Sequence, residues 1–424
     1  MDKKEISIPD LRRGQKPEQA APPPRDREEE EFYEEEEQSA PAKNGAAQEE
    51  RSALRALTAA PGLLRVLLAG LIILAVIMIY AMVKTNRVYT SFEVVSSYAR
   101  GEDSSAGFEL IRQGIVKYSN NGISLMNQAG TELWNQTYEM TSPVMVSNNH
   151  YIAVGDRGAN NIYIIDEYGS CSKMTTDVPI QELRISDQGV TAAILSDSES
   201  NYINMYSKDG QELVSIKATL GKTGYPLALA LSPDARRLVV SYLNIDSGRP
   251  SSKIVFYSFE DKASDHVLYE KDVDGICPKV EFLTQNRAAV FGEDACTIYA
   301  LDMQVSAVKD ITFKDEIRSV FTGDKQIGFV LRNNDDKGKY RVEFYNLAGE
   351  NILSSYLDLD YTQLHAGSED IVFSSSQEAV AMRYDGKIRF KAKFENRAVQ
   401  VLPSWEAGVY WVVYPRQIDE IRVR

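Results

Sequence analysis

The chain has 424 residues and a formal net charge of −14, from 61 acidic and 47 basic side chains, with three cysteines. So acidic a chain is a poor partner for nucleic acid, because binding to phosphates needs clustered lysine and arginine. Its length suits one large β domain with appendages or two ordinary domains. Cys171, Cys277 and Cys296 are too few for a disulfide scaffold and lack metal-site spacing, so we expect unpaired thiols, with one disulfide as the alternative.

Residues 1–62 are rich in Glu, Pro, Ala and Gln and include the acidic run EEEEFYEEEE at 28–37. They show almost no apolar periodicity and cannot bury enough surface to offset the entropy lost on ordering, so we expect disorder. Two interpretations are open for this tail. It binds a cytoplasmic partner, with Phe32 and Tyr33 as an aromatic anchor, or it is a solvated extension.

An uncharged run of eighteen residues, VLLAGLIILAVIMIYAMV, extends from Val66 to Val83. As a helix it would be about 27 Å long, close to the hydrocarbon thickness of a bilayer. Arg65 can extend the span while placing its charge at the lipid–water interface. The run therefore predicts a single-pass transmembrane helix over 63–83 that anchors the chain in a lipid bilayer.

The distribution of basic residues predicts the side of the membrane on which each part lies. Residues 1–65 contain eleven lysines or arginines, and short basic segments tend to remain in the cytoplasm. Close to the span, three basic residues on either side leave the count balanced. We predict a cytoplasmic N-terminus, a juxtamembrane linker over 84–90 and an extracytoplasmic domain over 91–424 at the cell membrane.

From residue 108 onward, short apolar runs separated by Gly, Asn and Asp are typical of an all-β chain. A hairpin recurs at intervals of roughly forty to fifty residues. Eight such hairpins can be counted, from IVKYS with GISLMNQAG (122–130) to VYWVV with IDEIRVR (418–424). Four strands per period predict a β-propeller of eight four-stranded blades. Seven blades are the alternative, because TIYALDMQVSAVKD in the fifth unit has a weak turn signal.

The stretch LSPDARRLVVSYL, residues 231–243, falls at the turn between the first and second strands of the fourth unit. Ser232 and Asp234 can hydrogen-bond to the local backbone and Pro233 sets its own φ, so we interpret these three residues as architectural. The stretch resembles the S-P-D-G turn of WD-repeat-like propellers. Ala235 stands where that turn has Gly, so we expect the turn to avoid a left-handed conformation.

The eighth unit lacks a fourth strand, whereas SFEVVSSYA (91–99) precedes the first unit as an unassigned strand. Since an unpaired strand edge invites aggregation, we predict that Phe92 to Tyr98 complete the last blade; a simple stalk is the alternative. Closure of the ring in this way would leave Lys84 to Thr90 as the connection to the span. Those residues reach at most about 25 Å, so the propeller would lie near the membrane surface.

The sequence predicts no catalytic, cofactor-binding or metal-binding residues, and it lacks P-loop, zinc-protease and serine-hydrolase motifs. The histidines fall in different units without ligand spacing: His150, His266 and His365. Tyrosines and tryptophans along the strands are interpreted as packing between blades rather than as a ligand platform; the tryptophans are Trp134, Trp405 and Trp411. Whether acidic residues converge in a central channel stays open.

Three stretches resemble an uncharacterised family of single-pass membrane propellers from Gram-positive bacteria: IVKYSNNGISLMNQAGTELWNQTYEM (115–140), YSKDGQELVSIKATLGKTGYPLALALSPD (206–234) and RNNDDKGKYRVEFYNLAG (332–349). The resemblance covers about residues 65–424 and implies fold and placement, without an activity or site residues. More remotely, the domain is similar to the quinoprotein-like propeller of an outer-membrane assembly lipoprotein, which favours protein binding.

We therefore predict a membrane-anchored, non-enzymatic propeller that needs no cofactor and recognises a protein or cell-wall component of the envelope. The alternative is an extracytoplasmic enzyme, similar to a glycosidase or a quinone-dependent dehydrogenase, with carboxylates in the central channel. Propeller active sites can draw single residues from distant blades, so the sequence leaves both open.

Overall fold

The computed structural model describes residues 61–101, 105–127, 129–148, 150–246, 248–260, 266–302 and 304–424. The acidic tail, for which we expect disorder, lies outside these residues except for Pro61 and Gly62. The chain separates into two compact units, with the boundary between Met78 and Ile79.

Helix α2 comprises Pro61–Asn86. Leucine, alanine and methionine favour the helix, and proline suits its first position. Its described large apolar side chains are exposed, among them Val66 and Val83 at 70% and 64%. None of the helices in the described part of the chain is both long enough and apolar enough to cross a membrane. The structure therefore does not support the transmembrane helix expected over 63–83.

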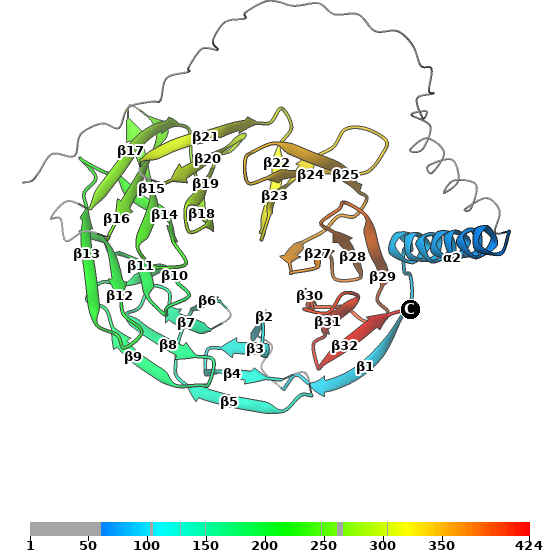
Figure 1. Cartoon of the computed structure of the whole chain (residues 1–424). Helices are drawn as coiled ribbons and strands as arrows, with labels where there is room; N and C mark the ends of the chain where they lie inside the picture. The colour runs from blue at the N-terminus through cyan, green and yellow to red at the C-terminus, as the bar shows by residue number, and fades with distance from the viewer. Residues whose placement is uncertain are drawn as a thin grey trace, which may run out of the picture. The chain divides into compact units, whose positions relative to one another are not determined.

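From residue 92 onward the described chain forms strands, and these make eight four-stranded antiparallel sheets around a ring (Figure 1). The fold class and the eight blades predicted from the sequence are confirmed. Blades 1 to 4 consist of β2 (Gly107–Ile111), β3 (Gly114–Ser119), β4 (Gly122–Met126) and β5 (Glu132–Thr137); β6 (Pro143–Ser147), β7 (Tyr151–Asp156), β8 (Asn161–Asp166) and β9 (Cys171–Thr175); β10 (Ile180–Ile185), β11 (Thr191–Ser196), β12 (Asn201–Tyr206) and β13 (Glu212–Ala218); and β14 (Tyr225–Leu231), β15 (Arg237–Asp246), β16 (Arg249–Ser258) and β17 (Val267–Asp274).

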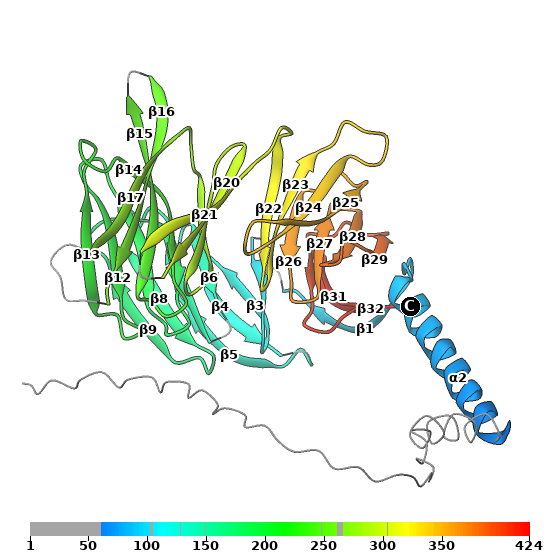
Figure 2. The same cartoon turned by 45° about the horizontal axis from the view of Figure 1, so that its top comes forward.

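Blades 5 to 8 follow the same order, except that the last takes its outer strand from the start of the domain. They consist of β18 (Lys279–Thr284), β19 (Arg287–Phe291), β20 (Ala295–Leu301) and β21 (Val305–Thr312); β22 (Ile317–Gly323), β23 (Gln326–Arg332), β24 (Tyr340–Asn346) and β25 (Asn351–Leu357); β26 (Gln363–Ala366), β27 (Asp370–Ser374), β28 (Glu378–Arg383) and β29 (Ile388–Lys393); and β30 (Gln400–Pro403), β31 (Val409–Val413), β32 (Gln417–Val423) and β1 (Phe92–Ala99). Strands β15 and β16 extend beyond their neighbours (Figure 2).

The hydrophobic core lies between the blades rather than within one central mass. The buried apolar residues form eight clusters, and each cluster joins two neighbouring blades. Between blades 3 and 4, for example, Ile194 and Met205 pack against Leu229 and Val240. Because neighbouring blades cover both faces of each sheet, most residues of its second strand are buried, which explains the apolar runs in the sequence.

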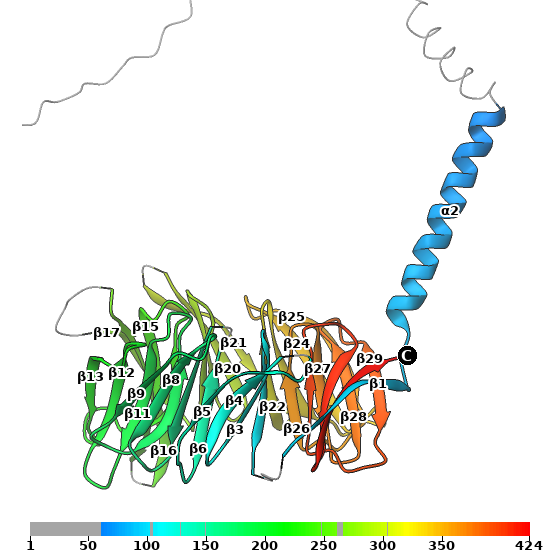
Figure 3. The same ribbon diagram turned by 90° about the horizontal axis from the view of Figure 1, so that it is seen from below.

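Strand β1 closes the ring by pairing antiparallel with β32, from Phe92 opposite Val423 to Ala99 opposite Gln417 (Figure 3). It is the outer strand of the blade that we expected residues 91–99 to complete. The Ser97 hydroxyl donates to Asp419 Oδ1 at 2.6 Å. The ring of Tyr98 stacks on buried Trp411, with centroids 6.0 Å apart, and rests against the turn between β4 and β5 in blade 1.

The turn between β14 and β15 is held by its own polar side chains. The Ser232 hydroxyl donates to Asp234 Oδ1 at 2.7 Å and accepts from the backbone N–H of Arg237 at 2.9 Å. Ala235 has φ of 59°, in the left-handed region. Our expectation that the turn avoids this conformation is therefore wrong: its hydrogen bonds outweigh the steric cost of an alanine Cβ, which is about 1–2 kcal/mol.

We predict that Tyr98→Ala lowers the free energy of unfolding by about 2–3 kcal/mol, less than for a fully buried aromatic residue. The substitution removes packing between the last blade and the first. Denaturant unfolding of the full chain measures the change. Val95→Ala is the matched control, because Val95 lies on the same strand and is 50% exposed; equal losses in the two variants would contradict the role given to Tyr98.

We predict that Ala235→Gly raises the free energy of unfolding by up to about 1 kcal/mol, because glycine adopts positive φ without a Cβ clash. Ala348→Gly is the control: Ala348 lies in an exposed turn and is not among the described residues with positive φ. That change should destabilise by about 0.5–1 kcal/mol through added chain entropy. Destabilisation by both variants in thermal unfolding would refute the strained-turn interpretation.

Candidate functional site

The first strand of each blade lines the centre of the ring (Figure 1). Charged side chains from three of these strands face a shared cavity of about 440 Å³: Glu109 of β2, Arg184 of β10, and Lys279 and Glu281 of β18. Carboxylates from distant blades therefore line one cavity in the channel, a question that the sequence left open.

The channel carboxylates are engaged by neighbouring side chains. Glu109 accepts a hydrogen bond from the Ser147 hydroxyl of the next blade. Glu281 accepts one from the Thr322 hydroxyl of the next blade at 2.5 Å and pairs with Lys279 at 2.7 Å. Burial raises the pKa of Glu109, and the bond from Ser147 lowers it by a smaller amount. In this arrangement the carboxylates join adjacent blades.

One face of the ring carries the turns between the first and second strands and between the third and fourth strands of each blade. We call it the linker face, because Asn86 accepts a hydrogen bond there from Lys387 Nζ, in the turn between β28 and β29, at 2.6 Å. A pocket of about 660 Å³ opens at this end of the channel. We call it the channel-mouth pocket; blades 1, 6, 7 and 8 contribute its lining, which includes Glu109, Leu110, Asp324, Lys325, His365, Tyr384, Leu402, Pro403 and Trp405.

Trp405 differs from the other two tryptophans in its exposure. Trp411 is buried and Trp134 packs partly buried between blades 1 and 2, as expected for packing residues. Trp405 is instead 43% exposed and lines the channel-mouth pocket. Its indole N–H donates to the Ile111 carbonyl of blade 1 at 3.1 Å, which fixes the ring. Its position in the turn between the first two strands of the last blade was the one signal in the sequence that could have indicated exposure.

Burial shifts the pKa of three groups in the pocket in the direction that favours the neutral form. Burial lowers the pKa of His365 and raises the pKa of Glu109. Burial also raises the pKa of Tyr384 to about 12, and its hydroxyl donates to the Gly367 carbonyl at 2.7 Å. With leucine, proline and an exposed indole beside these groups, the pocket offers apolar contact together with a few fixed polar groups, which is the composition of a binding site.

The remaining candidate residues lie apart from this pocket. His150 is exposed, 3.4 Å from Glu167, and His266 packs against Phe259. The three cysteines are free thiols, and burial raises the pKa of Cys277 and of Cys296. Within the described ranges, no three His, Cys, Asp or Glu side chains are grouped as a metal site would require.

With the ring and its pocket in place, the family can be identified. A family of unknown function, DUF5711, matches residues 85–423. The chain belongs to this family. The match covers the linker and all eight blades of the DUF5711 propeller but begins at residue 85, so the segment 65–84, which we expected the resemblance to include, lies outside it. No curated protein is recognisably similar in sequence.

Solved structures share the propeller fold at low sequence identity. Sqt1 from Saccharomyces cerevisiae has a TM-score of 0.54 at 11% identity, covering 79% of this chain and 100% of its own. A eukaryotic initiation factor has a TM-score of 0.50 at 13% identity, covering 76% and 83%. BamB from Moraxella catarrhalis has a TM-score of 0.49 at 12% identity, covering 78% and 100%. At this identity the likeness shows the fold alone.

Proposed function

We propose that this DUF5711 protein is a non-enzymatic binding propeller of the cell envelope, which holds a segment of a partner protein in the channel-mouth pocket. The observation that carries the proposal is Trp405, exposed at the pocket and held rigid by its hydrogen bond to blade 1. A tryptophan that is fixed before binding loses little conformational entropy on contact. Tryptophan is also enriched among the residues that dominate binding energy at protein interfaces.

The surroundings of Trp405 suit an apolar side chain flanked by polar backbone. Leu110, Leu402 and Pro403 supply apolar surface, while Asp324 and Lys325 from blade 6 place opposite charges on the lining. The channel carboxylates Glu109 and Glu281 already accept hydrogen bonds from the next blade. Recognition by surface contact therefore has more support than acid–base chemistry, and a protein segment fits better than a cell-wall polymer, which would need several free polar groups.

We also propose that α2 anchors the propeller in a lipid bilayer, with the N-terminus in the cytoplasm, where the acidic tail could meet a second partner, and the propeller outside. No described helix satisfies the requirements for a membrane span, so this part rests on the sequence. Eighteen consecutive uncharged residues run from Val66 to Val83, and the described large apolar side chains there are exposed. Apolar surface of this extent is costly in water.

The enzyme alternative has one observation in its favour, because Glu109 and His365 line the same pocket. Burial raises the pKa of Glu109 and lowers the pKa of His365. A carboxyl with a raised pKa is the kind of group that serves as a general acid. Against it, Glu109 also accepts the hydrogen bond from Ser147 that joins blades 1 and 2.

We predict that Trp405→Ala in the full chain reduces capture of the partner at least roughly tenfold, as expected for a residue that dominates an interface. Crosslinking in intact cells followed by quantitative mass spectrometry measures this. Tyr168→Ala is the matched control, because Tyr168 is 82% exposed and does not line the pocket. Capture unchanged by Trp405→Ala would refute the proposal, and so would turnover of a glycoside or alcohol substrate that Glu109→Gln abolishes.

For the anchor, we predict that the full chain resists extraction from membranes at alkaline pH, and that Leu71→Lys with Ile77→Lys releases it, because each buried charge costs about 2.5–3.5 kcal/mol in a bilayer. Protease added to intact cells should degrade the propeller and spare the tail. Leu220→Lys, at a site 71% exposed in the turn between β13 and β14, is the control. Extraction of the unmodified chain would refute the anchor, and degradation of the tail alone would reverse the orientation.

A further inference from the structure

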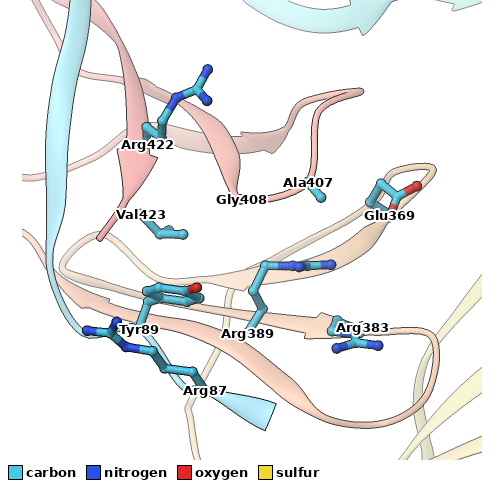
Figure 4. A pocket seen from close by; sticks show the side chains of 9 residues that line it. All are labelled: Arg87, Tyr89, Glu369, Arg383, Arg389, Ala407, Gly408, Arg422 and Val423. Atoms are coloured by element: carbon cyan, nitrogen blue, oxygen red, sulfur yellow. The ribbon is translucent and has the colours of Figure 1, made fainter. Parts of the chain in front are cut away.

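A second cavity on the linker face, of about 600 Å³, lies between the linker and blades 7 and 8 (Figure 4). Four of the nine residues that line it are arginines, and one is acidic, Glu369. The arginines come from separate parts of the chain: Arg87 of the linker, Arg383 of β28, Arg389 of β29 and Arg422 of β32. In a chain with a net charge of −14, this concentration of guanidinium groups at one cavity is exceptional.

The linker is fixed to the wall of this cavity by backbone hydrogen bonds. The N–H of Tyr89 donates to the Arg389 carbonyl at 2.8 Å, and the Tyr89 carbonyl accepts from the N–H of Lys391 at 2.9 Å. The pairing is a parallel bridge that runs alongside β29. The guanidinium of Arg87 then lies over the ring of Tyr89, 5.1 Å from its centroid. Two of the lining residues are thus held in place before any ligand binds.

Arg389 is only partly satisfied by the protein. Its Nε donates to both carboxylate oxygens of buried Asp370, at 2.9 and 2.8 Å, and Asp370 also accepts from the Tyr410 hydroxyl at 2.7 Å. Among the described residues, nothing hydrogen-bonds to the two Nη atoms of Arg389. Figure 4 shows its side chain extending across the cavity toward Glu369 and Arg383. Its outer N–H groups are therefore available to a ligand.

Two other arginines form ion pairs with acidic neighbours and still line the cavity. Arg422 pairs with Glu406 at 2.8 Å and Arg383 pairs with Asp385 at 2.7 Å. Arg87 has no acidic partner in the described part of the chain. Glu369 is the one carboxylate on the lining, against four guanidinium groups. Arg389 reaches toward Glu369 and Arg383, whereas Arg87 and Tyr89 lie on the other side of the cavity (Figure 4).

We propose that this cavity is a binding site for a phosphate group. A guanidinium presents paired N–H donors that match two oxygens of a tetrahedral phosphate. Several guanidinium groups around one cavity favour a phosphate ligand over a carboxylate ligand, because a phosphate has more oxygens and more negative charge to offer them. The same chemistry is offered by an anionic phospholipid headgroup and by soluble phosphate. Arg87 lies four residues after Val83, so a headgroup near the end of α2 is one source. No residue lines both this cavity and the channel-mouth pocket.

The test uses the full chain in a neutral detergent and follows the unfolding temperature of the propeller. In one arm, sodium phosphate is titrated against sodium chloride at matched ionic strength. In the other, dihexanoyl phosphatidylglycerol is titrated against dihexanoyl phosphatidylcholine. We expect a saturable rise with phosphate, with phosphatidylglycerol, or with both. Arg87→Gln and Arg383→Gln should weaken the apparent affinity roughly tenfold or more, the usual effect of removing a charged hydrogen-bond donor.

These two variants leave the Arg389–Asp370 pair intact, whereas Arg389→Gln would leave a buried carboxylate unpaired and could prevent folding. Arg332→Gln is the matched control, because Arg332 is exposed and paired with Glu316 on blade 6. A rise with phosphate alone would assign a soluble ligand, and a rise with phosphatidylglycerol alone a lipid headgroup. No saturable rise in the unmodified protein, or a rise that both lining variants retain in full, would overturn the proposal.

Discussion

The pairing of β1 with β32 is the constraint on which the other features of the propeller depend. The two strands lie at opposite ends of the domain, with Ser97 and Asp419 separated by 322 positions. Pairing two strands so far apart in the sequence costs loop-closure entropy, and contacts within single blades do not compensate for that cost. The compensating term is the cluster between blades 8 and 1, in which Tyr98 and Trp411 pack against Phe108 and Ile115. The channel-mouth pocket draws on both of these blades, so it exists only when the ring is closed.

The same run of chain also forms the wall of the arginine cavity. Tyr89 adds to β29 of blade 7, and Phe92, three residues later, packs edge-to-face on Phe390 with ring centroids 6.0 Å apart before pairing with blade 8. A ligand that binds Arg87 and Arg389 would therefore hold the linker against blade 7, beside the seam of the ring. Occupancy of the cavity and stability of the closure would be linked in this way, since binding to the native state alone stabilises it.

The sequence predicted what periodicity and chain arithmetic determine. Eight apolar hairpins predicted eight blades. The closure followed because the last unit lacked a fourth strand while an unassigned strand preceded the first unit. The left-handed conformation of Ala235 was missed because its steric cost, about 1–2 kcal/mol, is smaller than the stabilisation from the hydrogen bonds of Ser232 and Asp234. Trp405 and the arginines were missed for a different reason. Arg87 and Arg422 are more than three hundred positions apart, and no local pattern indicates that two such residues share a cavity.

The polar groups of the ring divide between two tasks, and this division bears on function. On the first strands that line the channel, Glu109 and Glu281 accept hydrogen bonds from hydroxyls of the following blade. Each of these hydrogen bonds uses one carboxylate oxygen to join two blades, so both side chains have a structural role in the ring. The indole of Trp405 also joins two blades through its N–H, but its ring face stays exposed. The proposed recognition at the linker face would therefore require no change in the contacts that close the ring.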